Sequence, residues 1–302
     1  MASKQSKELL DLFKRMNGAI AADPQMSMAD MRAVLEHGGD ATTEPRGVDY
    51  IEVDAGGVPA MWAVPKGCAE DRVVLCAHGG GYISGSMYTH RKMYAHYAKQ
   101  IGCRALIVDY ALAPENRHPG PVNDMAKAYQ WLLGLGITPY HLAIAGDSAG
   151  GGLAITTMLR LRELGVPLPV ASMPLSPWVD MEHTGSTFES NKNNDVLVSR
   201  EMVEFMASNF IGEKGNRRDP LANPLFADLR GLPPVYIEVG AFDVLLDDSR
   251  ALADALKKAG VDVKMEIFPE MQHIFNLLAG TAPEADDAIG KYAKWVRPKL
   301  GL

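Results

Sequence analysis

The segment LAIAGDSAGGG, residues 142–152, decides how this chain folds. Its centre, residues 146–150, matches the G-x-S-x-G nucleophile elbow, in which a serine lies at a sharp turn from a strand into a helix. Glycines flank Ser148 because the strained turn leaves no room for larger neighbours. The apolar run 142–145 predicts a short buried strand before the turn, and residues 149–164 predict a helix after it. No other serine has glycine two residues away on both sides, so Ser148 is the candidate nucleophile.

Strands and helices alternate along the rest of the chain, which predicts a largely parallel sheet. Eight strands are expected, at residues 48–53, 59–64, 72–77, 105–109, 142–145, 170–175, 235–239 and 263–268. Helices are expected at residues 88–101, 121–135, 149–164, 248–259 and 283–296. The predicted fold class is therefore α/β, with an eight-stranded, mostly parallel sheet flanked by helices.

Two segments do not fit this alternation. The N-terminal segment, about residues 1–45, predicts one or two amphipathic helices whose apolar side chains share a face. The inserted segment, residues 180–219, is first polar and irregular and then helical, and it is long for a plain connection between strands. We interpret the two segments as a helical cap over the strand ends of a single domain spanning residues 1–302.

The composition narrows the class of protein. A chain of 302 residues that is 47% hydrophobic can bury a large core. Its formal net charge of −7 argues against a nucleic-acid partner. The first residues lack the apolar core of a signal peptide, and no segment reaches transmembrane length, which predicts a cytoplasmic protein without stable membrane insertion. Cys68, Cys76 and Cys103 lack metal spacing and are expected to be reduced and structural.

A serine nucleophile needs a base to accept its proton, and the base needs an acid to orient it. In folds with a G-x-S-x-G nucleophile elbow, the three residues follow along the chain in the order serine, acid, histidine. Two histidines follow Ser148. His183 lies in the inserted segment, whereas His273 follows the expected strand 263–268, so His273 is the predicted base.

The acid is expected just beyond the carboxyl end of a strand. Asp243 meets this condition because it follows the strand 235–239. Asp247 and Asp248 are alternatives, but they lie beside a helix start, where acidic residues commonly serve as caps. Asp147, next to the nucleophile on a tight turn, is expected to brace the loop by hydrogen bonds.

The negative charge that develops on a substrate carbonyl needs hydrogen-bond donors, and a glycine-rich loop supplies them. The loop HGGG, residues 78–81, follows the third strand, and the candidate donors are the backbone N–H groups of Gly80, Gly81 and Ala149. A phosphate-binding loop is the alternative reading, but the loop lacks the G-x-G-x-x-G spacing and the chain lacks a Gly-Lys-Ser/Thr motif. Since zinc motifs are also absent and the eight histidines are scattered, we expect no metal or other cofactor.

Several motifs together carry a family resemblance. They are HGGGY at 78–82, DYALAPE at 109–115, GDSAGG at 146–151, DPL at 219–221, GLPP at 231–234, Asp243 and His273. The chain resembles the hormone-sensitive-lipase-like branch of the α/β-hydrolase family, the microbial esterases with the GDSAGG motif. The resemblance implies a carboxylester hydrolase with an eight-stranded sheet, a helical cap, no cofactor and activity on short to medium acyl chains. Members of this family often dimerise through the edge strand, so the resemblance also implies a homodimer through residues 263–268.

Two positions depart from the family pattern. Ala111 stands where the family usually has arginine, and Ile274 stands where it commonly has the glycine after the catalytic histidine. A β-branched side chain at position 274 is expected to crowd the substrate pocket. Similar histidine loops occur in relatives resembling monoterpene lactone hydrolases, so a cyclic ester is a candidate substrate. The predicted substrate pocket consists of Tyr82, Met202, Phe205, Met206, Phe210 and Ile274.

Two other functions stay open at this point. One is a non-catalytic small-molecule receptor with the same fold, similar to the gibberellin receptors. Such receptors lose the base, whereas His273 is present here. The other is an amidase or peptidase with the same three residues, which needs better protonation of its leaving group.

Overall fold

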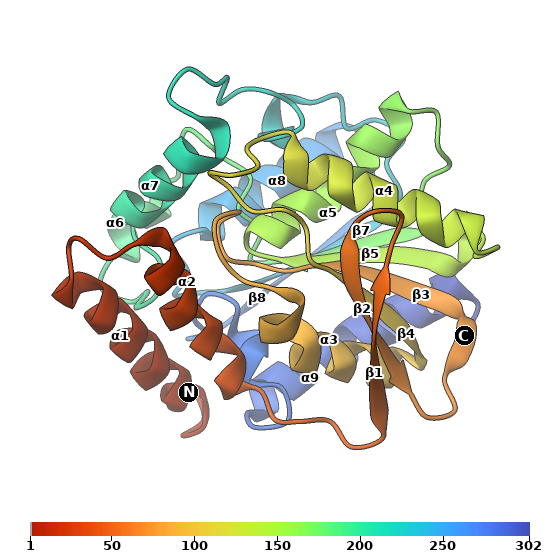
Figure 1. Ribbon diagram of the computed structural model, residues 1–302, viewed down its shortest axis with the longest axis horizontal. Coiled ribbons are helices and arrows are strands. Elements are labelled where there is room, and N and C mark those ends of the chain that lie inside the picture. The colour runs from red at the N-terminus through yellow and green to blue at the C-terminus, as the bar shows by residue number, and fades with distance from the viewer. Residues whose placement is uncertain (1) are drawn as a thin grey trace.

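The computed structural model describes residues 2–302 and has three layers, with helices on both faces of a central sheet (Figure 1). Within these residues the sheet has eight strands in the order β1-β2-β4-β3-β5-β6-β7-β8. Their bounds are β1 Val48–Asp54, β2 Pro59–Pro65, β3 Ala69–Ala77, β4 Cys103–Val108, β5 Leu142–Asp147, β6 Ala171–Leu175, β7 Val235–Gly240 and β8 Val263–Phe268. The strand β2 pairs antiparallel with β1 and β4, and the other neighbours pair parallel. The predicted fold class is confirmed.

The sheet separates two hydrophobic clusters because successive side chains of a strand point to opposite faces. In β3, Val73 and Leu75 belong to one cluster, and Val74 and Cys76 belong to the other. All six residues of β5 are buried, as expected for a central parallel strand covered on both faces. The strand β8 lies at the edge of the sheet, and dimerisation through it stays a prediction.

The helices that flank the sheet begin and end close to the expected positions. One face carries α3 Met87–Ile101 and α9 Pro283–Val296, and the other carries α4 Gly120–Gly134, α5 Ala149–Glu163 and α8 Leu246–Lys258. Short 3-10 helices are η1 His37–Ala41, η2 Pro139–His141, η3 Pro224–Phe226, η4 Phe275–Leu278 and η5 Arg297–Leu300. The structure contains no helix, within residues 2–302, of the length and apolar character needed to cross a membrane.

The N-terminal and inserted segments lie on the same side of the molecule (Figure 1). The first contains α1 Ser6–Ala22 and α2 Met28–Glu36, and the second contains α6 Thr187–Ser190 and α7 Arg200–Ile211. They are in direct contact, since the side-chain amide of Asn17 donates to the Val196 carbonyl (2.8 Å). The guanidinium of Arg32 ties α2 to the body of the protein by donating to the carbonyls of Ile83 (2.7 Å) and Ala113 (2.8 Å).

Candidate active site

Ser148 lies at the sharp turn between β5 and α5, with the strained backbone angles φ 54° and ψ −119°. Its N–H donates to the carbonyl of Leu175 on the neighbouring strand (2.9 Å). A Cβ atom at Gly146 would lie 2.0 Å from the carbonyl oxygen of Gly150, and one at Gly150 would lie 2.0 Å from that of Ala77. The expectation that only glycine fits on both sides of this serine is therefore confirmed.

His273 and Asp243 form a buried pair at the carboxyl ends of the last two strands. The Nδ1 atom of His273 lies 2.8 Å from Oδ2 of Asp243, whose Oδ1 accepts the N–H of Leu245 (2.7 Å). Burial would lower the pKa of His273, but the Asp243 carboxylate outweighs it, so this pKa is raised. Ser148 and His273 line one cavity. Within residues 2–302, the Ser148 hydroxyl makes no hydrogen bond to this ring, whose Nδ1 contacts Asp243.

The two alternative acids are engaged elsewhere. The Asp247 carboxylate accepts the Ser186 hydroxyl (2.7 Å) at the surface. The Asp248 carboxylate is buried and accepts the backbone N–H groups of Val179 (3.0 Å) and Asp180 (2.9 Å). Neither carboxylate contacts the imidazole among the residues described. The two side chains instead fasten α8 to the start of the inserted segment.

The buried carboxyl of Asp248 is expected to make the stability of the protein depend on pH. Burial raises its pKa to about 8, far above the value of about 3.9 in an unfolded chain. As pH rises between these values, the unfolded chain releases the proton and the folded protein keeps it, so the free energy of unfolding falls. We expect Asp248→Asn to lose less thermal stability than wild type between about pH 5 and pH 8. Asp254→Asn, an exposed change on the same helix, is the matched control. Thermal melts of the Asp248 variant that parallel wild type across this range would contradict the assignment.

In the loop after β3, two glycines allow the backbone to lie close to neighbouring groups. Gly80 and Gly81 have φ values of 111° and 62°, which glycine adopts without strain. A Cβ atom at Gly81 would lie 2.1 Å from Sδ of Met206 on α7. Among residues 2–302, the N–H groups of Gly80, Gly81 and Ala149 have no protein acceptor, so all three can donate to a bound ligand.

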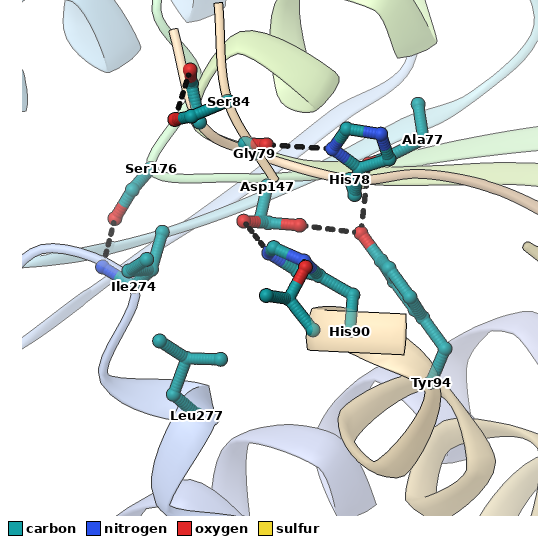
Figure 2. Close-up of polar contacts among 12 residues, drawn as sticks. Ala77, His78, Gly79, Ser84, His90, Tyr94, Asp147, Ser176, Ile274 and Leu277 are labelled. Atoms are coloured by element: carbon teal, nitrogen blue, oxygen red, sulfur yellow. Dashed lines mark hydrogen bonds and ion pairs between the residues drawn. The ribbon is translucent and has the colours of Figure 1, made fainter. Parts of the chain in front are cut away.

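A buried polar network lies beneath this loop (Figure 2). The Asp147 carboxylate is 3.1 Å from Nε2 of His90 and accepts the Tyr94 hydroxyl (2.7 Å). Burial would raise the pKa of Asp147, but these two partners hold it below its ordinary value. A Cβ atom at Gly79 would lie 2.3 Å from Oδ2 of Asp147, so the carboxylate packs directly against the glycine-rich loop. The expected bracing role of Asp147 agrees with these contacts. The two partners of Asp147, His90 and Tyr94, could not be identified from the sequence, because their four-residue spacing on α3 indicates a shared helix face but not the residue that this face contacts.

An apolar cavity of about 90 Å³ joins these elements. Its walls include Ser148, His273, Gly80, Gly81 and Ile274, together with Met202, Val203 and Met206 of α7 and Phe13, Met16 and Leu35 of the N-terminal helices. Of the predicted pocket residues, Met202, Met206 and Ile274 therefore face the cavity. The residues by which α1 and α2 line the cavity could not be predicted individually, because an apolar helix face does not indicate which part of the protein it packs against.

The three predicted aromatic residues do not line this cavity among the residues described. Phe205 lies on the outer face of α7 and is 44% exposed. Tyr82 and Phe210 are buried behind the cavity wall, where their rings stack with centroids 3.7 Å apart. On α7 the side chains of Met202, Val203 and Met206 face the cavity, and Phe205 points to solvent. Phe210 follows Met206 by four residues on the helix, but it lies beyond the cavity and packs on Tyr82 instead.

Ile274 has the left-handed backbone angles φ 46° and ψ 41°, which are rare for a β-branched residue. Its N–H donates to the Ser176 hydroxyl (3.4 Å), a contact visible in Figure 2. The side chain is 8% exposed and lines the cavity beside His273. A conformation of this kind costs about 1–3 kcal/mol and persists only where surrounding contacts enforce it.

Comparison with known proteins gives a consistent result. Residues 74–277 match a family described as having the α/β-hydrolase fold. An acetyl-hydrolase of Streptomyces hygroscopicus is 34% identical over 298 residues, covering 93% of this chain and 98% of the relative. An esterase of Acinetobacter venetianus is 32% identical, covering 74% of each chain. The crystal structure of an esterase from the bacterial hormone-sensitive lipase family superposes with a TM-score of 0.95 at 40% identity and covers 100% of both chains.

The chain therefore belongs to the α/β-hydrolase family, in its hormone-sensitive-lipase-like esterase branch. It is a carboxylesterase, as the esterases among its relatives show. The resemblance inferred from the motifs is confirmed. A non-catalytic receptor is no longer a competing interpretation.

Proposed function

We propose that this carboxylesterase hydrolyses short to medium acyl esters through an acyl-enzyme on Ser148, with His273 as base and Asp243 as orienting acid. One observation supports the proposal most: His273, whose Nδ1 lies 2.8 Å from Oδ2 of Asp243, lines the same cavity as Ser148. The Asp243 contact fixes the tautomer of the ring, because Nδ1 must carry its proton toward the carboxylate. The Nε2 atom is then free to accept the serine proton.

The reaction follows in two halves. His273 takes the hydroxyl proton as the Ser148 oxygen attacks the ester carbonyl, and it then gives this proton to the departing alcohol. The N–H groups of Gly80, Gly81 and Ala149 donate to the oxyanion in the tetrahedral state. A water molecule, deprotonated by His273, releases the acid and restores the serine. Each oxyanion donor contributes about 100- to 1000-fold in rate.

The cavity supports a preference for small acyl groups. Its volume of about 90 Å³ is smaller than the roughly 150 Å³ that holds benzene in an engineered apolar cavity of another protein. We infer that the N-terminal and inserted segments act together as the cap, because α1, α2 and α7 supply one wall of this cavity. Substrate entry and acyl length would then depend on the same helices.

A substrate screen tests this function. Purified protein is assayed with nitrophenyl esters of rising acyl length, with lactones and with arylamides. The proposal predicts the highest kcat/KM on esters of short to medium acyl chains. A lactone or an arylamide hydrolysed with a higher kcat/KM than every ester would overturn the proposed substrate class and favour the cyclic-ester or amidase alternative.

Ile274 is expected to limit acyl length. Replacing it with glycine removes a wall of the cavity, and each newly buried methylene contributes about 0.8 kcal/mol. We therefore expect Ile274→Gly to raise kcat/KM on a longer acyl ester relative to kcat/KM on a shorter one, by up to roughly fourfold per added carbon. The measurement is an ester series of rising chain length with wild type and variant.

The competing effect of this change is a looser His273 loop, which would lower kcat/KM for all esters alike. Leu278→Ala is the matched control, because Leu278 is buried in η4 but does not line the cavity. The control is expected to lower activity without changing the chain-length preference. A uniform loss in Ile274→Gly, equal for all chain lengths, would remove Ile274 from the pocket wall and leave it a loop-stiffening residue.

A further inference from the structure

A stretch of the inserted segment, residues 191–198, contacts both loops that carry the proposed acid and base. We call this stretch the clamp. At its start, the side-chain amide of Asn191 donates to the backbone carbonyls of Ala241 (3.0 Å) and Asp243 (2.8 Å). The clamp thereby holds the backbone of the acid loop by two hydrogen bonds at its first residue.

The clamp is also bound to the histidine loop. The side-chain oxygen of Gln272, the residue before His273, accepts the N–H of Val196 (3.1 Å), and its amide donates to the carbonyl of Asn194 (2.9 Å). On its other side, Asn17 of α1 donates to the Val196 carbonyl. The clamp therefore links the cap helices, the acid loop and the base loop.

Asp195 lies at the centre of the clamp and is only 7% exposed. Its Oδ1 accepts the N–H groups of Leu197 and Val198 (2.9 Å each), and its Oδ2 accepts the N–H of Val244 (3.0 Å), the residue after Asp243. Leu197 and Val198 line the catalytic cavity. A single carboxylate thus joins the cavity wall to the acid loop through charge-assisted hydrogen bonds, which are stronger than neutral ones.

We propose that Asp195 is a positioning residue of this esterase, which fixes the backbone beside Asp243 and joins the acid–base pair to the cavity wall formed by the clamp. The inference rests on the proposed function, since it assigns Asp195 to the support of Asp243 and His273. Asp195 makes no contact with the reacting atoms. It acts through the loop that it holds and through the field of its charge.

The charge of Asp195 reaches the catalytic base. Burial and the neighbouring Asp243 raise the pKa of Asp195 to about 6, so the carboxylate is ionised above that pH. The groups that face His273 are Asp243 after β7, Asp195 in the clamp and Asp147 at the end of β5, and all three raise the pKa of the imidazole. Removing the charge at position 195 should therefore lower the pKa of His273, while loss of hydrogen bonds alone should not.

The test is the pH profile of kcat/KM on a short nitrophenyl ester for wild type and Asp195→Asn. The variant keeps the size of the side chain and removes its charge. We expect the acidic limb to move to lower pH by about one unit. We also expect kcat/KM on the plateau to fall about tenfold or more, because small displacements of catalytic groups are costly. An acidic limb that coincides with that of wild type would overturn the proposal, whatever the plateau.

Asp248→Asn is the control for altered hydrogen bonding at a buried carboxyl that accepts two backbone N–H groups. Because burial raises the pKa of Asp248 to about 8, this substitution removes no charge below that pH, and the acidic limb of the variant should stay in place. Asp195→Glu keeps the charge and is expected to keep the limb. If Asp195→Asn does not fold, Asp195→Ser carries the same expectation. Asp243→Asn distinguishes failure of the proposed function from failure of this inference. If Asp243→Asn is nearly as active as wild type, the proposed function is wrong. If Asp243→Asn is inactive but the acidic limb of Asp195→Asn coincides with that of wild type, only the inference about Asp195 is wrong.

Discussion

Replacing Ser148 with alanine is expected to abolish ester hydrolysis and to leave the fold intact. The acyl-enzyme requires the Ser148 oxygen as its nucleophile, and without it the oxyanion donors and substrate binding leave an acceleration of only about 10³- to 10⁴-fold over water. We expect kcat to fall by about a millionfold, as it does when the nucleophile of a comparable protease is removed. The measurement is hydrolysis of a short nitrophenyl ester, with circular dichroism and a thermal melt to verify folding.

Ser249→Ala is the control for this variant. Ser249 is buried in α8, and its hydroxyl has no hydrogen-bond partner among the residues described. Its removal is expected to leave kcat/KM close to wild type. A purified Ser148→Ala protein with full activity would show that the elbow serine is not the nucleophile.

Asp243→Asn is expected to lower kcat by about 10⁴-fold, the loss seen when the acid of the best-studied serine triad is changed in this way. The amide no longer favours the tautomer in which Nδ1 carries the proton, and it gives the imidazolium no counter-charge. The plateau rate on a short ester measures this loss, since the altered carboxyl lies outside the cavity wall.

The alternative acids provide the internal comparison. Asp247 contacts Ser186, and Asp248 contacts the backbone of residues 179–180, so neither substitution by asparagine removes a contact to the imidazole. We expect Asp247→Asn and Asp248→Asn to lower kcat only slightly. A ranking in which Asp247→Asn or Asp248→Asn loses more activity than Asp243→Asn would identify a different carboxylate as the acid.

The fold could be predicted from sequence because its signals are local. Apolar runs bounded by turns mark the eight strands. The glycines at positions 146 and 150 specify a turn that only glycine fits, because a Cβ atom at either position would lie 2.0 Å from a backbone oxygen. The pairing of Asp243 with His273 was also anticipated, since both follow strands whose carboxyl ends meet at one edge of the sheet. These inferences need no knowledge of distant contacts.

The cavity wall could not be predicted to the same extent. Which face of α7 turns inward depends on its packing against Tyr82, so Phe205 and Phe210 were assigned to the pocket although one is exposed and the other stacks behind the wall. The role of Asp195 depends on contacts made 49 residues along the chain, at Val244, and no local pattern indicates them. The same holds for His90, which reaches Asp147 from 57 residues away.

The central claim, that Ser148 forms the covalent intermediate, is tested most directly by trapping that serine. Phenylmethylsulfonyl fluoride transfers its sulfonyl group to an activated serine oxygen and releases fluoride. Wild-type protein is incubated with this reagent, its loss of activity is followed, and the modified residue is located by peptide mass spectrometry. We predict loss of activity in step with a single adduct on Ser148, and no such adduct when Asp243→Asn is treated for the same time. Complete inactivation with the adduct on a different residue would contradict the account.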